Sequence, residues 1–179
     1  MRYVAFLRAI NVGGRTTRME ELRAAFEGLG FECVETFIAS GNVIFESGSK
    51  ATAILQKKIE AKLLTACGYD VSTFIRTDAE VAAVAAYRPF RESDLKAAAA
   101  LNVAFIHEPL DASAAKVLSG FRTPIDDFHA HGREVYWLCR KKQSESTFSN
   151  AAFEKGLAIR ATFRGINTVR RLADKYPPR

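Results

Sequence analysis

The sequence has only short apolar runs and few cysteines, and both shortages exclude large classes of protein. The run nearest the N-terminus, residues 3–7, is five residues long, which is too short for a signal-peptide core or a membrane span. We therefore expect a cytoplasmic protein without a membrane partner. The three cysteines, Cys33, Cys67 and Cys139, are widely spaced and form no Cys-x-x-Cys pair. This spacing predicts reduced, buried thiols and indicates no metal site, redox centre or cofactor.

Signatures of catalytic and nucleotide-binding loops are also missing. The sequence contains no phosphate-binding loop of NTPases, no dinucleotide-binding glycine pattern and no Gly-x-Ser-x-Gly nucleophile turn. His129 and His131 would share one face of a strand, where Asp126 or Asp127 could join them around a metal, but a third ligand at motif spacing is missing. Solvated turn residues are the preferred interpretation. No reaction is indicated, and whether the chain is an enzyme stays open.

What the sequence does contain is a globular composition with uneven charge. Of its 179 residues 48% are apolar, including thirteen Phe, enough for one compact domain or two small subdomains. The net charge is +6, but residues 133–179 carry eleven Lys or Arg against four acidic residues, which is +7 and leaves −1 for residues 1–132. This asymmetry favours either an anionic partner for the C-terminal part or a solvated basic face.

The most informative stretch is residues 36–45, where two β-rich apolar runs flank a Ser40-Gly41-Asn42 turn. Gly and Asn tolerate the positive φ angles of a tight turn. Phe37 and Ile38 on one side of the turn are residue types that favour a buried, pleated surface. The pattern predicts a β-hairpin that spans residues 33–45.

Strand and helix patterns around this hairpin give the first half a βαββαβ order, the ferredoxin-like pattern. The predicted elements are a strand over residues 3–8, a helix from Thr17 to Gly30, the hairpin, a helix from Ser49 to Gly68, and a strand over residues 71–76. Thr17-x-x-Glu20 has the spacing of a capping box, and Ser49 is expected to cap the second helix.

The second half begins at residue 78, so the predicted subdomains are residues 1–77 and 78–179. Asp78 is expected to cap a connecting helix that ends before Pro89. A strand over residues 101–107, a short helix capped by Asp111 and a hairpin over residues 125–139 then give a βαββ order. A helix from Asn150 and a final helix, capped by Asn167, follow it.

Two stretches match a known family. Residues 3–14, with the Met19-x-x-Leu22 helix and residues 37–45, resemble the N-terminal signature of the bacterial domain of unknown function 1697 family, and residues 150–157 and 161–169 resemble its closing segment. The resemblance implies an α+β fold of two ferredoxin-like subdomains with mainly antiparallel sheets, and no known reaction or cofactor. Ala9 stands where the family usually has Gly. The closing Thr-Arg-Asn-Trp-Asn-Thr pattern and the usual Gly-x-Ser-Lys stretch are only loosely matched.

Three polar segments are the candidate binding surface, and we expect them to converge on a small phosphate- or carboxylate-bearing ligand. Glycine lets backbone N–H groups approach an anion, and a helix start with a nearby Arg adds positive charge. The candidate residues are Asn11, Gly13, Gly14, Arg15, Ser40, Gly41, Asn42, Arg164, Asn167 and Thr168. For each segment the competing interpretation is structural, namely a turn that needs Gly or an ordinary capped helix.

Three other functions stay open. The basic C-terminal part, with Arg140 beside Tyr136 and Trp137, is a candidate nucleic-acid surface, although no RNP1-like pattern occurs. An enzyme acting on a small phosphorylated or carboxylated substrate would need a concave pocket with a titratable group. A scaffold without any ligand would have a filled surface. The sequence does not indicate an oligomeric state.

Overall fold

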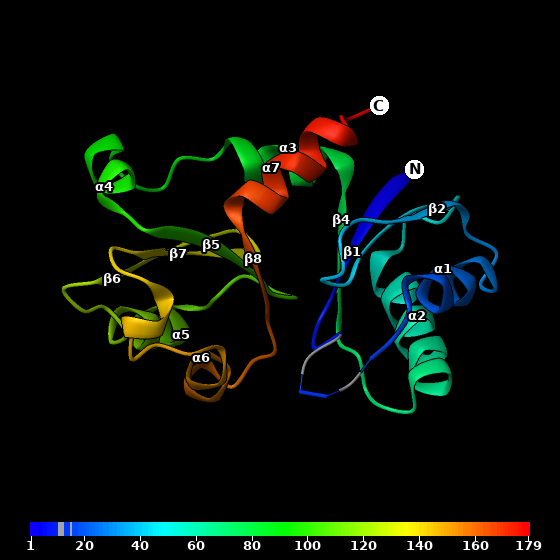
Figure 1. Cartoon of the computed structure of the whole chain (residues 1–179), viewed down its shortest axis with the longest axis horizontal. Coiled ribbons are helices and arrows are strands. Elements are labelled where there is room, and N and C mark those ends of the chain that lie inside the picture. The colour runs from blue at the N-terminus through cyan, green and yellow to red at the C-terminus, as the bar shows by residue number, and fades with distance from the viewer. Residues whose placement is uncertain (11–12, 15) are drawn as a thin grey trace. The chain divides into compact units, whose positions relative to one another are not determined.

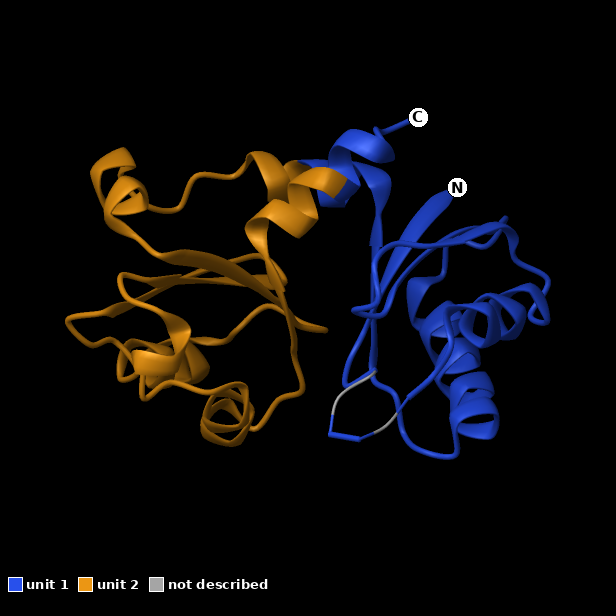
Figure 2. Cartoon of the chain, in the orientation of Figure 1, with its two compact units in different colours: residues 1–82, 172–179 blue, residues 83–171 orange. Residues whose placement is uncertain are grey.

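The computed structural model describes residues 1–10, 13–14 and 16–179, and the chain forms two compact units (Figure 1, Figure 2). Unit 1 consists of Met1–Ala82 and Leu172–Arg179, and unit 2 of Ala83–Arg171. The division falls inside α3 (Asp78–Ala86), whereas the sequence places the boundary between residues 77 and 78. The last eight residues return to unit 1, a feature that the sequence did not predict.

Unit 1 has the predicted βαββαβ order. Its elements are β1 (Arg2–Leu7), α1 (Met19–Glu27), β2 (Glu32–Thr36), β3 (Asn42–Glu46), α2 (Thr52–Cys67) and β4 (Thr73–Thr77). Within the described residues the strands form a four-stranded antiparallel sheet in the order β2-β3-β1-β4. This is the strand order of a ferredoxin-like sheet.

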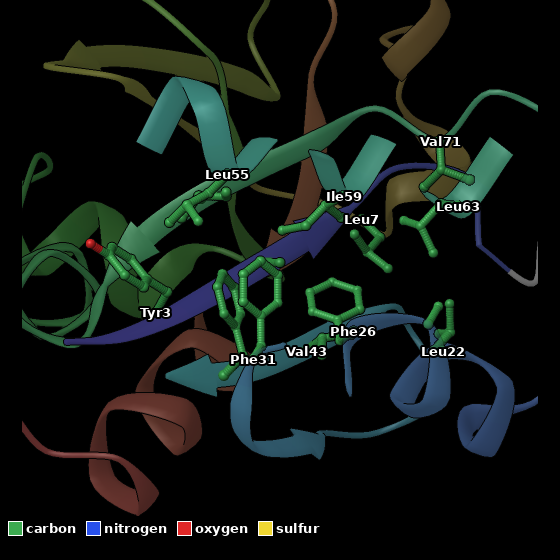
Figure 3. Close-up of a cluster of buried hydrophobic side chains, with 14 of the residues drawn as sticks. Tyr3, Leu7, Leu22, Phe26, Phe31, Val43, Leu55, Ile59, Leu63 and Val71 are labelled. Atoms are coloured by element: carbon green, nitrogen blue, oxygen red, sulfur yellow. The ribbon is translucent and has the colours of Figure 1, made fainter. Parts of the chain in front are cut away.

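The core of unit 1 lies between this sheet and its two helices (Figure 3). β1 is buried on both faces, as its uninterrupted apolar run predicted. In α2 the residues Leu55, Ile59 and Leu63 recur every fourth position and are buried, as the periodicity that predicts the helix from Ser49 to Gly68 requires. Tyr3 of β1 stacks on Phe45 of β3 with ring centroids 5.5 Å apart. The hydrophobic pattern of this half therefore predicted its packing.

Unit 2 repeats the topology of unit 1. Its elements are β5 (Ala100–Phe105), α5 (Ala112–Ser119), β6 (Asp126–His131), β7 (Glu134–Cys139), α6 (Asn150–Leu157) and β8 (Thr162–Gly165). The described strands pair antiparallel in the order β6-β7-β5-β8. The sequence predicted only βαββ here, because β8 has four residues and no alternation long enough to recognise. The α+β class with two ferredoxin-like units is confirmed.

Three further helices and one 3₁₀ turn connect or follow these elements. They are α3, α4 (Glu92–Ala97), η1 (Gln143–Glu145) and α7 (Ile166–Lys175). β8 leads straight into α7 (Figure 1). Asn167 was predicted to cap this last helix, but the helix begins one residue earlier, so Asn167 lies in its first turn.

Two predicted caps in the first half are wrong. α1 begins at Met19, and the backbone N–H of Arg18 donates to Glu21 Oε2 at 3.1 Å. Thr17 is instead buried, with its hydroxyl 3.2 Å from that of Tyr69. Ser49 accepts from the N–H of Ala51 at 3.3 Å, a bond that precedes α2. Spacing alone did not distinguish a cap from a residue beside it.

The start of α3 is closed by a different residue from the predicted Asp78. Thr77 Oγ1 accepts from the backbone N–H of Glu80 at 3.1 Å, and Glu80 Oε2 accepts from the backbone N–H of Thr77 at 2.7 Å. This reciprocal pair is a capping box. Asp78 is the first helical residue and accepts from the N–H of Ala79 at 2.8 Å. In the second half, by contrast, the predicted cap Asp111 is confirmed by a 2.8 Å bond from Ala114 N–H.

The hairpin of unit 1 is confirmed, but its first strand is shorter than predicted. β2 ends at Thr36, so Phe37 and Ile38 lie in the connection, where Ile38 has a φ of 51° and is 42% exposed. β2 also contains an irregularity between its pairs with β3, and Cys33, inside it, has a φ of 49° and is exposed. The prediction of a buried thiol is therefore wrong for Cys33 and right for Cys139, and Cys67 is only half-buried.

Candidate functional site

The junction between β8 and α7 combines a sheet edge with a helix start. Gly165, the last residue of β8, pairs with Asn102 of β5, and Ile166 begins the helix. The first N–H groups of a helix have no partner within it, and together they carry the positive end of the helix dipole. Glycine has no side chain that could accept from them. The junction therefore presents backbone donors that its own preceding residue does not cap.

A pocket of about 450 Å³ lies at this junction, entirely within unit 2. Its polar lining comprises Asn102, Gln143, Asn167, Thr168 and Arg170. Its apolar lining comprises Leu95, Ala98, Ala99, Ala100, Leu101 and Ile166. Among the described lining residues Arg170 is the single charged one.

Two buried polar atoms at the pocket lack a hydrogen-bond partner among the described residues: Nδ2 of Asn102 and Nε of Arg170. Asn102 keeps only 8% of its surface exposed. Its side chain faces the end of β8, since a Cβ added to Gly165 would lie 4.0 Å from Asn102 Oδ1. Buried polar groups in folded proteins are almost always bonded, so each exception needs an explanation. Here both exceptions are donors, and both belong to residues that line the same pocket.

The predicted residues Asn167 and Thr168 lie in this pocket, and Arg164 does not. Arg164 alternates along β8 with Phe163, which packs on Phe153 in the unit 2 core, so its side chain leaves the opposite face of the sheet. Its guanidinium donates to Thr162 Oγ1 and to the carbonyl of Phe163, each at 2.8 Å. Burial lowers the pKa of Arg164 to about 10. These contacts support β8 itself.

The predicted glycine loop lies in unit 1. Gly13 and Gly14 have φ angles of 64° and 81° and are exposed, so this turn uses a left-handed conformation at both positions. Asn11 and Arg15, predicted to act with them, lie outside the described residues. The structural interpretation of a turn that needs Gly fits these angles, and anion binding at this loop stays a prediction.

The Ser40-Gly41-Asn42 turn, also in unit 1, is organised by its own contacts. Asn42 is fully buried, and its Nδ2 donates to the carbonyl of Phe37 at 3.0 Å and to Ser40 Oγ at 2.8 Å. Gly41 has a φ of 71°, and an added Cβ would lie 3.0 Å from Cβ of Ile10. The turn thus packs beside the end of β1, and its polar groups hold the hairpin. Its convergence with the residues of unit 2 stays a prediction.

The proposed aromatic surface for nucleic acid is not exposed. Tyr136 and Trp137 are both buried, and the indole Nε1 of Trp137 donates to Asp126 Oδ1 at 2.8 Å. Arg140 lies 3.4 Å from Asp94 Oδ1 and 3.9 Å from Asp127 Oδ2. Stacking of bases on this strand is therefore blocked by burial, and nucleic-acid binding stays a prediction that rests on the net charge alone.

The two histidines of β6 both contact Tyr87; His131 is exposed, as expected for a residue beside a turn, whereas His129 is half-buried. His129 Nε2 is 3.0 Å from the Tyr87 hydroxyl, and the His131 ring stacks on Tyr87 with centroids 4.1 Å apart. Burial, with the neighbouring charges of His131 and Arg122, lowers the pKa of His129. Within the described residues no three His, Cys, Asp or Glu side chains gather as metal ligands, and no helix has the length and apolarity to cross a bilayer.

Sequence reasoning missed Asn102, Arg170 and Gln143. Asn102 sits in a strand whose other residues are almost all apolar, a weak signal that one position faces a polar site. Arg170 was counted only as part of the basic C-terminal part, although it lies one helical turn after Ile166. Gln143 belongs to the stretch where the family motif is loosely matched. The lining comes from segments up to 75 positions apart, Leu95 to Arg170, so spacing could not group it.

Comparison with known proteins identifies a family but no activity. Residues 1–136 match the model of the family described as "Protein of unknown function (DUF1697)". Among solved structures, a conserved bacterial protein from Streptococcus pneumoniae is similar over 99% of this chain and 98% of its own, with a TM-score of 0.77 and 21% sequence identity. That similarity shows the fold. No protein of curated function matches the chain.

Proposed function

The chain belongs to the DUF1697 family of proteins of unknown function, and we propose that it binds a small anionic ligand, bearing a phosphate or a carboxylate, in the pocket at the start of α7. The proposal is one of binding, because the described lining residues include no Asp, Glu, His, Cys, Lys or Tyr that could act as acid, base or nucleophile near neutral pH.

The observation that carries the proposal is the side-chain amide of Asn102. Its Nδ2 lacks a partner among the described residues although the residue is more than nine-tenths buried. A buried donor left unbonded costs about 1–3 kcal/mol, and an amide NH₂ group can only donate. A ligand that accepts hydrogen bonds in the pocket would satisfy it.

The other polar groups at the pocket also favour a negatively charged acceptor. Arg170 brings a positive charge and the unpartnered Nε–H, and the first turn of α7 brings backbone N–H groups and the helix dipole. An anion at a helix start is stabilised by about 0.3–1 kcal/mol at an exposed site and by more where solvent is excluded. Donors from β5 and from two places on α7 thus surround one space.

The test is an NMR titration of the ¹⁵N-labelled chain with sodium phosphate and, separately, sodium acetate, at constant ionic strength set with sodium chloride. We expect chemical-shift changes at the Asn102 side-chain NH₂, the Arg170 Nε–H and the backbone amides of residues 166–168. Arg170→Gln should weaken binding by about tenfold or more, because it removes a charge-assisted hydrogen bond.

Arg171→Gln is the matched control. It removes the same charge from the next position on α7, which does not line the pocket, and should leave the affinity within about twofold. Equal weakening in both variants, or shifts spread over the basic residues that disappear with added salt, would contradict the proposal and support a solvated basic face.

A further inference from the structure

We infer that the ligand of this pocket is a monocarboxylate that carries a compact apolar body. The inference rests on the proposed function and specifies its ligand class. Three observations point to it: the same strand–helix junction occupied by a carboxylate in unit 1, a single positive charge in the pocket, and an apolar wall beside the donors.

The first observation comes from the internal repeat. β4 passes into α3 as β8 passes into α7, and the residue before each junction is an arginine, Arg76 or Arg164, that pairs with the equivalent position of β1 or β5. In unit 1 the carboxylate of Glu80 closes the junction through the N–H and hydroxyl of Thr77, at 2.7 and 3.2 Å.

In unit 2 the residues at the equivalent positions leave this junction open. Gly165 stands at the position of Thr77, and Thr168 stands at the position of Glu80. Across the sheet, Asn102 stands at the position of Tyr3, so a small amide replaces a large ring. Unit 2 therefore keeps the helix start and omits the internal carboxylate, and a carboxylate from outside the chain has the chemistry of the group that is missing.

The second observation is charge. Arg170 is the single charged side chain among the described residues of the lining, and Asn102, Gln143, Asn167 and Thr168 are neutral. One guanidinium matches one negative charge, whereas a second negative charge in a partly desolvated site would be uncompensated and costly. At neutral pH a phosphate monoester carries nearly two charges and a carboxylate one.

The third observation is the apolar wall. Leu95 of α4, residues 98–101 and Ile166 line the same pocket, whose volume of about 450 Å³ greatly exceeds the space that a carboxylate needs. A water molecule takes about 30 Å³, so room for an apolar body of several carbon atoms remains beside the donors. Pockets for small molecules typically combine such an apolar lining with a few polar groups that fix orientation.

The test compares hexanoate, acetate, monohexyl phosphate and hexanamide by the same NMR titration at pH 7.5. Hexanoate should bind at least about tenfold more tightly than acetate, because each fully buried methylene contributes about fourfold. It should also bind more tightly than monohexyl phosphate, and hexanamide should not bind measurably. Leu95→Ser should remove most of the advantage of hexanoate over acetate, and the amide dispersion of its ¹⁵N spectrum checks independently that the variant is folded.

The outcomes separate this inference from the proposed function. Tighter binding of monohexyl phosphate, or equal binding of hexanoate and acetate, would overturn the ligand class and leave anion binding standing. The same holds if Leu95→Ser changes nothing. If none of the anions shifts the signals of Asn102 and Arg170, the proposed function itself fails.

Discussion

The two units have one topology, and they differ at the junction where their last strand enters a helix. In unit 1 the junction is closed from within by Thr77 and Glu80, and Tyr3 fills the space across the sheet by stacking on Phe45. In unit 2 the equivalent junction has Gly165, and the side chains around it leave a pocket. The difference shows that this fold makes a helix start available at both places, and that side chains at a few positions decide whether a pocket remains beside it.

The correspondence between the two units extends into their hydrophobic cores. Ala5 pairs with Val43 in unit 1, and Ala104 pairs with Val135 in unit 2, so the same two residue types occupy equivalent positions. Two pairs further along, on the same face of each sheet, Tyr3 pairs with Phe45, whereas Asn102 pairs with Trp137. Packing is thus alike up to the junction and diverges there.

The largest effect on stability is expected when Tyr3 of unit 1 is replaced by the asparagine that unit 2 has at the equivalent position. Tyr3→Asn removes a fully buried ring and puts an unpartnered amide in its place, and should lower the free energy of unfolding by about 3–5 kcal/mol. Urea denaturation followed by circular dichroism measures it. Tyr3→Phe, which loses only the 2.9 Å bond from the hydroxyl to the carbonyl of Ser49, should cost about 1 kcal/mol. Equal costs would show that the ring is not what fills this junction.

Opening the closed junction should have the next largest effect. Glu80→Gln removes the charge that accepts from the backbone and side chain of Thr77, and should cost about 1–2 kcal/mol in the same denaturation experiment. Glu92→Gln is the matched control, since Glu92 also lies in the first turn of a helix but is 80% exposed and pairs with Lys96. Its cost should stay below about 0.5 kcal/mol. A similar cost for both variants would mean that any carboxylate in the first turn of a helix has this effect, and that the contact of Glu80 with Thr77 is not its cause.

Closing the open junction should have a smaller effect on stability and a large one on binding. Thr168→Glu puts an internal carboxylate beside the donors at the start of α7 and should raise the free energy of unfolding by about 0.5–1 kcal/mol. The introduced carboxylate would repel an anion and fill the space beside the donors, so anion binding should weaken by at least about tenfold. The NMR titration measures this change. Thr168→Gln, of the same shape without the charge, should change both quantities much less. Unchanged anion binding in Thr168→Glu would mean that the anion lies elsewhere.

The smallest effect concerns the edge strands, where the two units carry different titratable groups at equivalent positions. Glu35 pairs with Ile44 in unit 1, and His129 pairs with Tyr136 in unit 2. Each bonds to a tyrosine: Tyr176 donates to Glu35 Oε2 at 2.6 Å, and the Tyr87 hydroxyl lies 3.0 Å from His129 Nε2. The bond from Tyr176 lowers the pKa of Glu35, and burial lowers that of His129.

Both pKa values are lower in the folded state than the ordinary 6.5 of His and 4.5 of Glu. The contribution of each group to the stability of the folded protein therefore decreases as the pH falls. The contribution of His129 is complete above pH 6.5 and declines below it, and that of Glu35 declines only below pH 4.5. Each should be below about 1 kcal/mol, because Glu35 is exposed and His129 is only half-buried. Urea midpoints measured from pH 8 to pH 3.5 should flatten in the upper range for His129→Gln and in the lower range for Glu35→Gln. Flattening of the lower range by His129→Gln, or of the upper range by Glu35→Gln, would contradict these directions of the pKa shifts.

The sequence alone predicted most of the scaffold. Periodic apolar residues such as Leu55, Ile59 and Leu63 predicted the helices, and the hairpin around residue 41 and the βαββαβ order of the first half were recognised. β8 was missed, because four residues carry too little pattern. Four predicted caps, Thr17, Ser49, Asp78 and Asn167, were wrong, since neighbouring polar residues offer similar spacing and only the backbone geometry selects among them.

Only part of the candidate site was predicted from the sequence. The sequence pointed to Asn167 and Thr168 at a helix start next to a basic segment, because capping residues and charge are local properties. Only the tertiary structure brought Asn102 from β5 and Leu95 from α4 to that helix and showed that an Asn102 donor is buried without a partner among residues 1–10, 13–14 and 16–179. Whether a polar atom is satisfied depends on every segment folded around it, and the pairing of Asn102 in β5 with Gly165 in β8 joins positions more than sixty residues apart. Local physics therefore determined the elements and their caps in outline, and long-range packing decided where a space for a ligand remained.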